Sequence, residues 1–371
     1  MVVPAAIWLV GVLLWSARRP SGGKQLPAIS IIVAARNEEE LIRSCLESLL
    51  GQNYPDRLIE ILLVDDHSTD RTPQIAEELR TAHPGRLRVL SAPPSPPGFG
   101  SKKWALQYAI RQARGEILLF TDADCVVRPE WAATMMTHFG PGVGAVTGAI
   151  FPPLRQGLGE RLFRLERLMV SLTTASAIGW GHPASAAGGN FAYRREVFEK
   201  LGGLAHPELA SGDDDLMAQT IARRGWRVDF AKGADSVVTD LRPPDVRRAI
   251  AAAARHQSTL RYYPLRWRAL FALSIVSGAA VLGCIVAAFL QVSLVFPLIA
   301  GLLLRAGLDL AGVNRFCHSL RQTVSPADFA LAEVLLPFYL VARPLFLLSP
   351  RFAWKGRVHS SAVPLPGETR T

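Results

Sequence analysis

Apolar positions form long runs at both ends of the chain and short runs in its middle. Residues 1–17 carry no charge, and Arg18 and Arg19 follow them directly. A cleaved signal peptide begins with basic residues and ends in small ones, so the order found here favours a retained membrane anchor. We assign this anchor to residues 1–22.

A second uncharged run, residues 269–304, is too long for one crossing of a bilayer at about 1.5 Å per helical residue. It predicts two helices that turn near residues 291–293. A third apolar run, residues 329–348, contains two prolines and an arginine, and it could cross the membrane, re-enter it or lie in the interface. The predicted units are an N-terminal anchor (1–22), a central domain (23–265), membrane helices (266–349) and a basic tail (350–371).

The central domain alternates short apolar runs with amphipathic stretches. Such runs, bounded by turn residues, are typical of parallel strands that are buried on both faces. We predict four strands, at residues 29–34, 59–64, 87–90 and 117–120. The stretches between them, such as residues 38–50 and 72–81, have helical periodicity. This order predicts an α/β fold with a mostly parallel, Rossmann-like sheet.

Polar clusters follow three of these predicted strands, and ligands of open α/β sheets bind at the carboxyl ends of strands. They are Arg36-Asn37-Glu38, Asp65-Asp66 and Asp122-Ala123-Asp124. Two carboxylates separated by one residue can hold Mg²⁺ or Mn²⁺, since these ions are bound by a few protein oxygens together with substrate phosphates. For an isolated pair a solvated turn is the better explanation, but the position after the fourth strand reverses this preference and favours a metal site at Asp122 and Asp124.

Charge changes this picture by indicating an orientation. The net charge is +10, and basic residues flank the central domain on both sides. Basic flanks face the cytoplasm in membrane proteins, which predicts an integral membrane protein with a cytoplasmic domain. The sequence contains no nucleic-acid-binding motif, so anionic lipid explains the basic excess better than nucleic acid does. The four cysteines form no CxxC pair and predict no disulfide.

Six motifs in order, over about residues 28–230, resemble the membrane-bound branch of the family 2 glycosyltransferases, which includes lipid glucosyltransferases and polysaccharide synthases. The motifs are Ala34-Ala35-Arg36-Asn37-Glu38-Glu39, Val64-Asp65-Asp66-His67-Ser68-Thr69-Asp70, Ser101-Lys102-Lys103-Trp104-Ala105-Leu106, Asp122-Ala123-Asp124, Gly188-Gly189-Asn190-Phe191-Ala192-Tyr193-Arg194-Arg195 and Ser211-Gly212-Asp213-Asp214-Asp215-Leu216. The resemblance implies a GT-A fold and a nucleotide-diphosphate sugar as donor, with a UDP-sugar as first choice.

The resemblance also implies roles for individual residues. Those on the nucleotide-sugar side are Ala35, Glu38, Asp66, Lys102 and Asp122, and Asp124 is the direct metal ligand beside Asp122. Glu38 is explained nearly as well as an acid in the first turn of a helix. Asp66 could be an Asx-turn cap of a helix and could serve both purposes. Gly189 and Asn190 match a loop on the acceptor side, for which an ordinary turn is the alternative.

Three consecutive carboxylates, Asp213 to Asp215, exceed what a helix cap needs. The family's catalytic base lies about twelve residues before the tryptophan of a Gly-Trp pair, and Gly225-Trp226 therefore indicates Asp214. Asp213 is assigned to the acceptor or diphosphate side.

One signature departs from the family. A Gln-x-x-Arg-Trp motif precedes the next membrane helix in processive synthases, whereas this chain has Arg255, His256 and Gln257 followed by Arg261 and Tyr262. Arg255, Gln257 and Arg261 are candidates for the diphosphate or acceptor side, and the departure weighs against long processive synthesis.

The sequence therefore predicts an inverting glycosyltransferase that uses Mg²⁺ or Mn²⁺ and acts on a hydroxyl of a lipid or lipid-linked acceptor at the cytoplasmic membrane face. Three alternatives stay open: a polyprenyl-phosphate glycosyltransferase, a processive polysaccharide synthase, and a nucleotide-binding membrane scaffold without activity.

Overall fold

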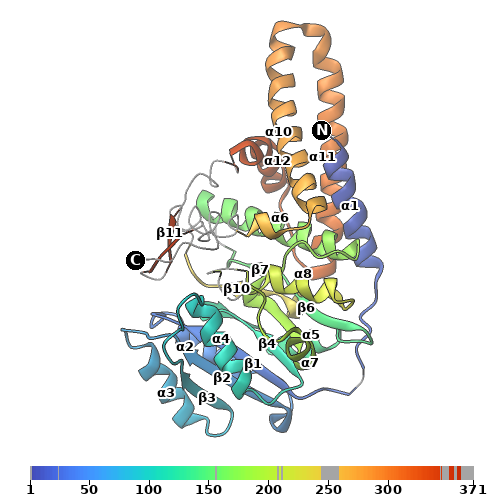
Figure 1. Cartoon of the computed structure of the whole chain (residues 1–371). Coiled ribbons are helices and arrows are strands. Elements are labelled where there is room, and N and C mark those ends of the chain that lie inside the picture. The colour runs from blue at the N-terminus through green and yellow to red at the C-terminus, as the bar shows by residue number, and fades with distance from the viewer. Residues whose placement is uncertain are drawn as a thin grey trace.

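The computed structural model describes residues 2–23, 25–154, 157–206, 209, 212–243, 259–342, 344, 351–354 and 357–360. Figure 1 shows an α/β body at the bottom and a long helical hairpin that projects from it. The body holds the polar clusters, and the hairpin holds the longest apolar runs.

A seven-stranded sheet forms the centre of the body, in the order β3-β2-β1-β4-β8-β6-β9. The strands are β1 (Ile29–Ala35), β2 (Ile59–Asp65), β3 (Leu87–Ser91), β4 (Ile117–Phe120), β6 (Val143–Thr147), β8 (Phe191–Arg194) and β9 (Arg227–Phe230). The first four are parallel to one another, and β8 is antiparallel to both of its neighbours. The four predicted strands and the mostly parallel sheet are confirmed.

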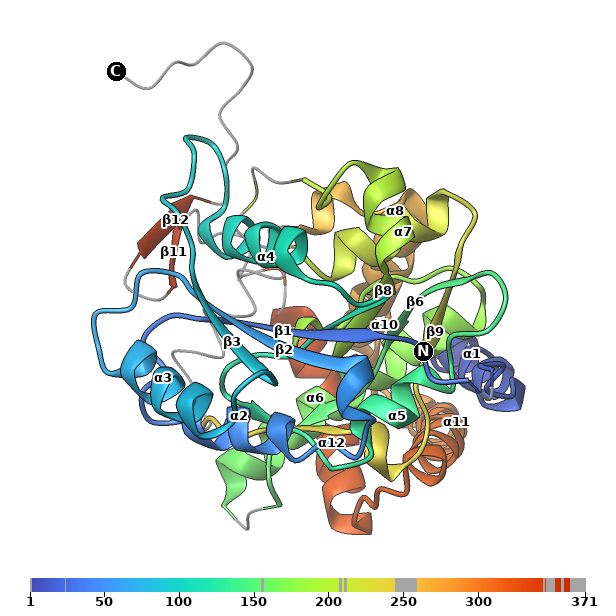
Figure 2. The same cartoon turned by 90° about the horizontal axis from the view of Figure 1, so that it is seen from below.

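Alternate residues of each strand contribute to different hydrophobic clusters, as the period of two in a strand requires. Ile32 and Leu62 belong to one cluster, while Ile31 and Leu63 belong to the other. The second cluster contains α2 (Ile42–Leu50), α3 (Thr72–Ala82) and α5 (Trp131–Met136). The first contains residues of α4 (Ser101–Gln112), α6 (Leu158–Gly179), α7 (Arg195–Leu201) and α8 (Asp215–Arg223). Helices therefore cover the sheet on both faces (Figure 2).

A small second sheet lies beside the end of β4. It consists of β5 (Cys125–Val126), β10 (Val238–Asp240) and β7 (Ile150–Phe151), with β10 in the middle. Because β10 pairs antiparallel with β5, Asp240 lies opposite Cys125, directly after the Asp122-Ala123-Asp124 cluster. Segments more than a hundred residues apart thus meet at this edge.

The projecting hairpin consists of α10 (Leu265–Leu290), the short helix η5 (Val292–Leu294) and α11 (Val295–Leu320). The turn lies where the sequence predicted it. Both helices are long and apolar enough to span a membrane, and near the turn Phe289 and Leu290 are 85% and 86% exposed. Residues 329–342 of the third apolar run lie in α12 (Pro326–Ala342), which contains Pro337. The strands β11 (Arg351–Trp354) and β12 (Arg357–Ser360) lie further along the chain.

The N-terminal helix α1 (Val2–Ala17) is shorter than a membrane span and contacts both α6 and α11. It crosses α6 closely, because a Cβ at Gly179 would lie only 1.9 Å from the carbonyl oxygen of Gly11. Trp15 is fully buried and donates a hydrogen bond to the carbonyl oxygen of Phe230 at 2.8 Å. The end of α1 is thus part of the body's core as well as apolar on its outer face.

Candidate active site

The loops after β1 and β2 are joined by hydrogen bonds. The Asn37 side chain accepts from the backbone N–H of Thr69 at 2.8 Å, and the Glu38 N–H donates to the Thr72 hydroxyl at 2.8 Å. Asn37 has a φ of 51°, a left-handed conformation that asparagine tolerates better than most residues. These bonds fix the two loops relative to each other at the carboxyl ends of the strands.

Asp66 is buried in this pair of loops. Its N–H donates to the carbonyl oxygen of Ala35 at 2.8 Å, so the two predicted nucleotide-side residues are neighbours. The turn after β2 is closed by Asp65, whose carboxylate accepts the N–H of Ser68. The start of α3 is closed by Asp70. Asp65 and Asp70 thus supply the described turn bonds after β2, on either side of the buried Asp66.

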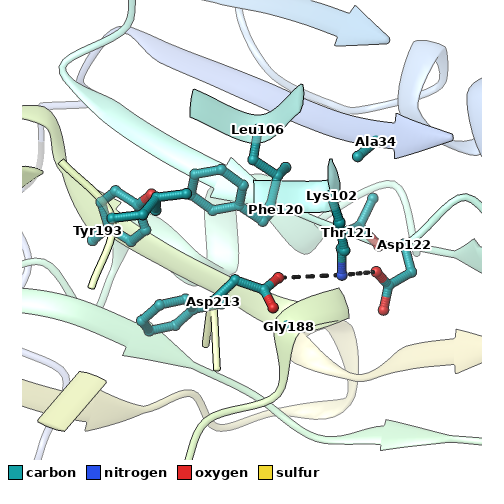
Figure 3. A pocket seen from close by; sticks show the side chains of 11 residues that line it. Ala34, Lys102, Leu106, Phe120, Thr121, Asp122, Gly188, Tyr193 and Asp213 are labelled. Atoms are coloured by element: carbon teal, nitrogen blue, oxygen red, sulfur yellow. Dashed lines mark hydrogen bonds and ion pairs between the residues drawn. The ribbon is translucent and has the colours of Figure 1, made fainter. Parts of the chain in front are cut away.

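Lys102 joins two carboxylates from different parts of the chain (Figure 3). It lies in the first turn of α4, and its Nζ is 3.1 Å from Oδ1 of Asp122 and 3.2 Å from Oδ2 of Asp213. The Asp122 side chain is 40% exposed, whereas that of Asp213 is 10% exposed. The structure thus brings Asp122 and Asp213 to opposite sides of one ammonium group.

The glycine pair of the short helix η2 (Gly188–Asn190) lies between the carboxylate clusters. The N–H of Gly188 donates to Oδ2 of Asp214 at 2.8 Å. A Cβ on Gly189 would lie 2.7 Å from Oδ2 of Asp122, so only glycine allows this approach without a shift. One backbone turn therefore separates the Asp122 carboxylate from the Asp214 carboxylate.

The aspartate triplet contains three carboxylates with different surroundings. Asp215 is 4% exposed and accepts hydrogen bonds from the Thr259 and Tyr263 hydroxyls, at 2.8 and 2.6 Å. Asp214 is half-buried and accepts only backbone N–H groups among the bonds described, from Gly188 and Asp215. Burial, together with the nearby charges of Asp215 and Asp213, raises the pKa of Asp214 to about 7.

Arg242 is a site residue that the sequence analysis missed. Its Nε lies 2.6 Å from Oδ2 of Asp124, and its Nη2 lies 2.6 Å from both carboxylate oxygens of Glu38. Asp240, two residues earlier, accepts the Arg242 N–H, and burial beside Asp124 raises its pKa to about 6. In the sequence, Asp240 and Arg242 stand after the short apolar run of β10, and nothing in the sequence indicates which residues they contact.

The carboxylates fit a hard divalent cation. One ligand atom each of Asp122, Asp124 and Cys125 lie within 4.8 Å of one another. Burial raises the pKa of the Cys125 thiol well above its usual range, so this sulfur stays protonated and suits a hard cation poorly. The two carboxylates are the suitable ligands, and the exposed side of Asp122 leaves space for phosphate and water oxygens.

Four predicted acceptor-side residues have different surroundings or lie outside the described residues. Asn190 is fully buried: its amide donates to the Ala149 and Ser236 carbonyls and accepts from Trp131, so this side chain is directed into the core. Arg261 is exposed, with its guanidinium 4.9 Å from the Tyr262 ring. Arg255 and Gln257 lie outside the described residues.

Comparison with known families gives two overlapping matches. The family described as glycosyl transferase family 2 matches residues 30–202. The family described as glycosyl transferase family group 2 matches residues 117–344, more than half of the chain, and this match extends through α10, α11 and α12.

Curated relatives have related names. The probable glycosyltransferase YdaM of Bacillus subtilis is 30% identical over 213 residues, which cover 56% of this chain and 49% of that protein. The beta-monoglucosyldiacylglycerol synthase of Nostoc is 38% identical over 116 residues, 31% of this chain and 23% of that protein. The poly-beta-1,6-N-acetyl-D-glucosamine synthase of Staphylococcus epidermidis is 32% identical over 201 residues, which cover 54% of this chain and 45% of that protein. The chain spans about half, or less, of the length of these relatives.

Among solved structures, the mannosyltransferase PcManGT from Pyrobaculum calidifontis, in complex with GDP-Man and Mn²⁺, superposes with a TM-score of 0.58. It is 20% identical in sequence, and the match covers 94% of this chain and 95% of that one. The two proteins share a fold, which confirms the expected GT-A architecture.

Proposed function

Because the chain belongs to glycosyl transferase family group 2 and is a glycosyltransferase, we propose that it moves a sugar from a nucleotide-diphosphate sugar to a hydroxyl of a lipid acceptor. We propose a UDP-sugar as donor, inversion at the anomeric carbon, and a catalytic domain on the cytoplasmic face of the membrane.

The observation that carries this proposal is the separation of two carboxylate centres by one glycine turn. Asp122 approaches the Cβ position of Gly189, and Asp214 accepts from the N–H of Gly188. An in-line displacement needs a leaving-group site and a base on opposite sides of the sugar. Because this turn carries no side chains, a sugar bound over it could approach both centres.

On the donor side, the joined loops after β1 and β2 would hold the nucleotide through Ala35, Glu38 and Asp66. Asp122 and Asp124 would hold a divalent cation. When bound, this cation would neutralise the negative charge of the departing diphosphate. Lys102, already 3.1 Å from Asp122, places a second positive charge where the diphosphate leaves.

On the acceptor side, Asp214 would take the proton of the acceptor hydroxyl while that oxygen attacks the anomeric carbon. The bond between the anomeric carbon and the diphosphate oxygen breaks as the new glycosidic bond forms. Asp215 cannot readily replace Asp214, because hydroxyl groups of Thr259 and Tyr263 already donate to its buried carboxylate.

A lipid acceptor is supported by the position of the hairpin. Asp215 begins α8 and bonds to Tyr263, which lies two residues before α10. The base loop is thus tied to the first turn of a helix that exposes large apolar side chains. An acceptor anchored in a bilayer around α10 would present its head group beside Asp214.

The direct test is to incubate membranes that contain the full-length protein with several radiolabelled nucleotide-sugars. The lipids are then extracted, and the radiolabel incorporated into them is measured. We expect one donor to give a discrete lipid-soluble product that is absent with Asp214→Asn. A ladder of long products would identify a processive synthase instead. Transfer to no acceptor with any donor, despite donor binding, would support the inactive scaffold.

The proposed orientation predicts a labelling pattern. Gln74→Cys is exposed on α3, and Ser293→Cys is exposed at the turn between α10 and α11. In a background without the exposed Cys284, we expect an impermeant thiol reagent to label position 293 in intact cells and position 74 only after lysis. The reverse pattern would place the catalytic domain outside.

The tie between Asp215 and the membrane helix predicts a role for Tyr263 in positioning the base. Tyr263→Phe removes one donor from a buried carboxylate, which costs about 1–3 kcal/mol, and should lower kcat about tenfold with unchanged nucleotide affinity. Tyr262→Phe is the matched control, because the neighbouring ring instead lies 4.8 Å from His206. Equal kcat values for the two variants would contradict this role.

A further inference from the structure

Each carboxylate of the Asp122-Ala123-Asp124 cluster has an internal cation beside it. Lys102 contacts Asp122, and Arg242 contacts Asp124. The two cations differ in their geometry: Lys102 offers one ammonium group, whereas the planar guanidinium of Arg242 bridges Asp124 and Glu38 with three contacts of 2.6 Å. Such charge-assisted, multidentate contacts are among the strongest hydrogen bonds in proteins.

The backbone holds Arg242 in this position. The N–H of Leu241 donates to the carbonyl oxygen of Asp124 at 2.9 Å, and the N–H of Arg242 donates to Asp240 at 2.9 Å. Strand β10 ends at Asp240, which pairs with Cys125 of β5. The Arg242 side chain is only 25% exposed. The contact with Asp124 is therefore fixed by the fold and is not a chance encounter of two surface side chains.

We propose that Arg242 is a resident cation that occupies the Asp124 carboxylate and excludes free divalent metal until the nucleotide diphosphate arrives. This inference rests on the proposed function, in which Asp124 is a metal ligand. The contact uses Oδ2 of Asp124, so an ion bound through that oxygen competes with the guanidinium for its negative charge.

The exchange is unfavourable for the ion alone and favourable for the ion with its nucleotide. Mg²⁺ and Mn²⁺ bind through one or two carboxylates and complete their shells with substrate phosphates and water. Without a diphosphate, the ion gains few protein ligands and leaves the guanidinium without its Asp124 partner. With a diphosphate, the added oxygens offset that loss. Metal and nucleotide binding are therefore coupled through Arg242, and such coupling is reciprocal.

The test is a titration of the full-length protein in detergent with Mn²⁺, followed by the signal of free Mn²⁺ in electron paramagnetic resonance, with and without UDP. Without UDP, Arg242→Gln should bind Mn²⁺ at least about tenfold more tightly than the unaltered protein, since a charge-assisted competitor is gone. The gain in Mn²⁺ affinity on adding UDP should shrink by a similar factor. Arg242→Lys keeps the positive charge but loses the bridge between Asp124 and Glu38. Its Mn²⁺ affinity should lie between those of the unaltered protein and Arg242→Gln.

Arg128→Gln is the matched control. It removes a positive charge four residues after Asp124, but its side chain is 57% exposed and pairs with Asp235 instead. We expect less than about a twofold change in Mn²⁺ affinity, because an exposed charge is screened. An equal gain in Arg128→Gln and Arg242→Gln would mean that overall charge, and not displacement, governs the affinity, and would overturn the proposal.

Two further outcomes separate this inference from the proposed function. Unchanged or weaker Mn²⁺ binding in a folded Arg242→Gln protein would overturn the exclusion of metal by Arg242. If Arg242→Gln does not fold, the Mn²⁺ affinity of Arg242→Lys is measured instead, and an unchanged or weaker affinity would likewise overturn the proposal. Asp124→Asn tests the metal site itself. If Asp124→Asn lost Mn²⁺-dependent UDP binding while Arg242 variants behaved as the unaltered protein, the metal site would stand and only the inference would fail.

Discussion

Replacing Asp214 by asparagine should lower turnover by at least about two orders of magnitude while nucleotide affinity changes little. A hydroxyl is a poor nucleophile near neutral pH, and a positioned base contributes roughly a hundred- to ten-thousand-fold. The nucleotide-side residues lie across the Gly188–Gly189 turn from Asp214, so their contacts survive the change. Steady-state kinetics together with a UDP-binding titration would measure the two effects separately.

The asparagine also has a structural cost that the experiment must separate. Both oxygens of Asp214 accept backbone N–H groups, one from Gly188 and one from Asp215. An amide has a single oxygen, so one buried donor loses its acceptor at about 1–3 kcal/mol. Thermal unfolding of each variant gives this cost directly. A loss of turnover in a protein that stays folded at the assay temperature then reports on the base.

A pH profile gives an independent signature of the same group. Burial, together with the charges of Asp215 and Asp213, raises the pKa of Asp214 to about 7, and the charge of Lys102 opposes this rise. A base acts in its ionised form, so kcat should rise as the pH passes through about 7 and level off above that pH. In Asp214→Asn this limb should disappear and leave a low rate. A limb that persists unchanged would assign the titration to another group.

The neighbours of Asp214 decide between competing assignments. Asp213→Asn removes a partner of Lys102, and Asp215→Asn removes the acceptor for Thr259 and Tyr263. If either of these variants were inactive while Asp214→Asn kept its activity, the base would lie one residue away from our assignment. If all three stayed active, the acceptor would supply its own anionic oxygen, as a polyprenyl phosphate does.

Much of the sheet could be predicted because β1, β2 and β4 are buried on both faces and therefore form nearly continuous apolar runs. The Asp122-Ala123-Asp124 cluster was found because it directly follows such a strand, β4. The antiparallel strand β8 carries no such signal, since its position between β4 and β6 depends on pairing with distant strands. Local patterns specify elements, whereas long-range pairing specifies their neighbours.

The same limit applies to the side chains of the site. Asn190 stands beside two glycines that do approach the carboxylates, but its amide turns inward to bond Trp131 and two carbonyl groups. Arg242 lies 118 residues after Asp124, and only the pairing of β10 with β5 brings them together. A motif names residue types at a position, while side-chain direction and partners come from the three-dimensional fold.

Removal of divalent cations should abolish transfer, and Mg²⁺ or Mn²⁺ should restore it. The charge that develops on the leaving diphosphate is stabilised by several kcal/mol when a cation lies beside it, which corresponds to a loss of about two orders of magnitude or more without it. Excess EDTA followed by addition of each metal measures both steps. Full activity in excess EDTA would contradict the metal site at Asp122 and Asp124.

Asp124→Asn should reproduce the effect of EDTA, and added metal should not reverse it. The amide keeps a hydrogen-bond acceptor for Arg242, which also retains both contacts to Glu38, so the β5–β10 edge should stay intact. What disappears is the negative charge that a hard cation requires. The matched control is Asp235→Asn, an exposed acid paired with Arg128, which should keep normal activity and metal response.

Because Asp124→Asn acts on donor binding and Asp214→Asn acts on the acceptor proton, the first should raise the dissociation constant for UDP with Mn²⁺, and the second should not. If Asp124→Asn instead bound UDP normally and lost only turnover, the ligand of the cation would have to be another of the carboxylates at this edge, with Asp122 and Asp240 the next to replace.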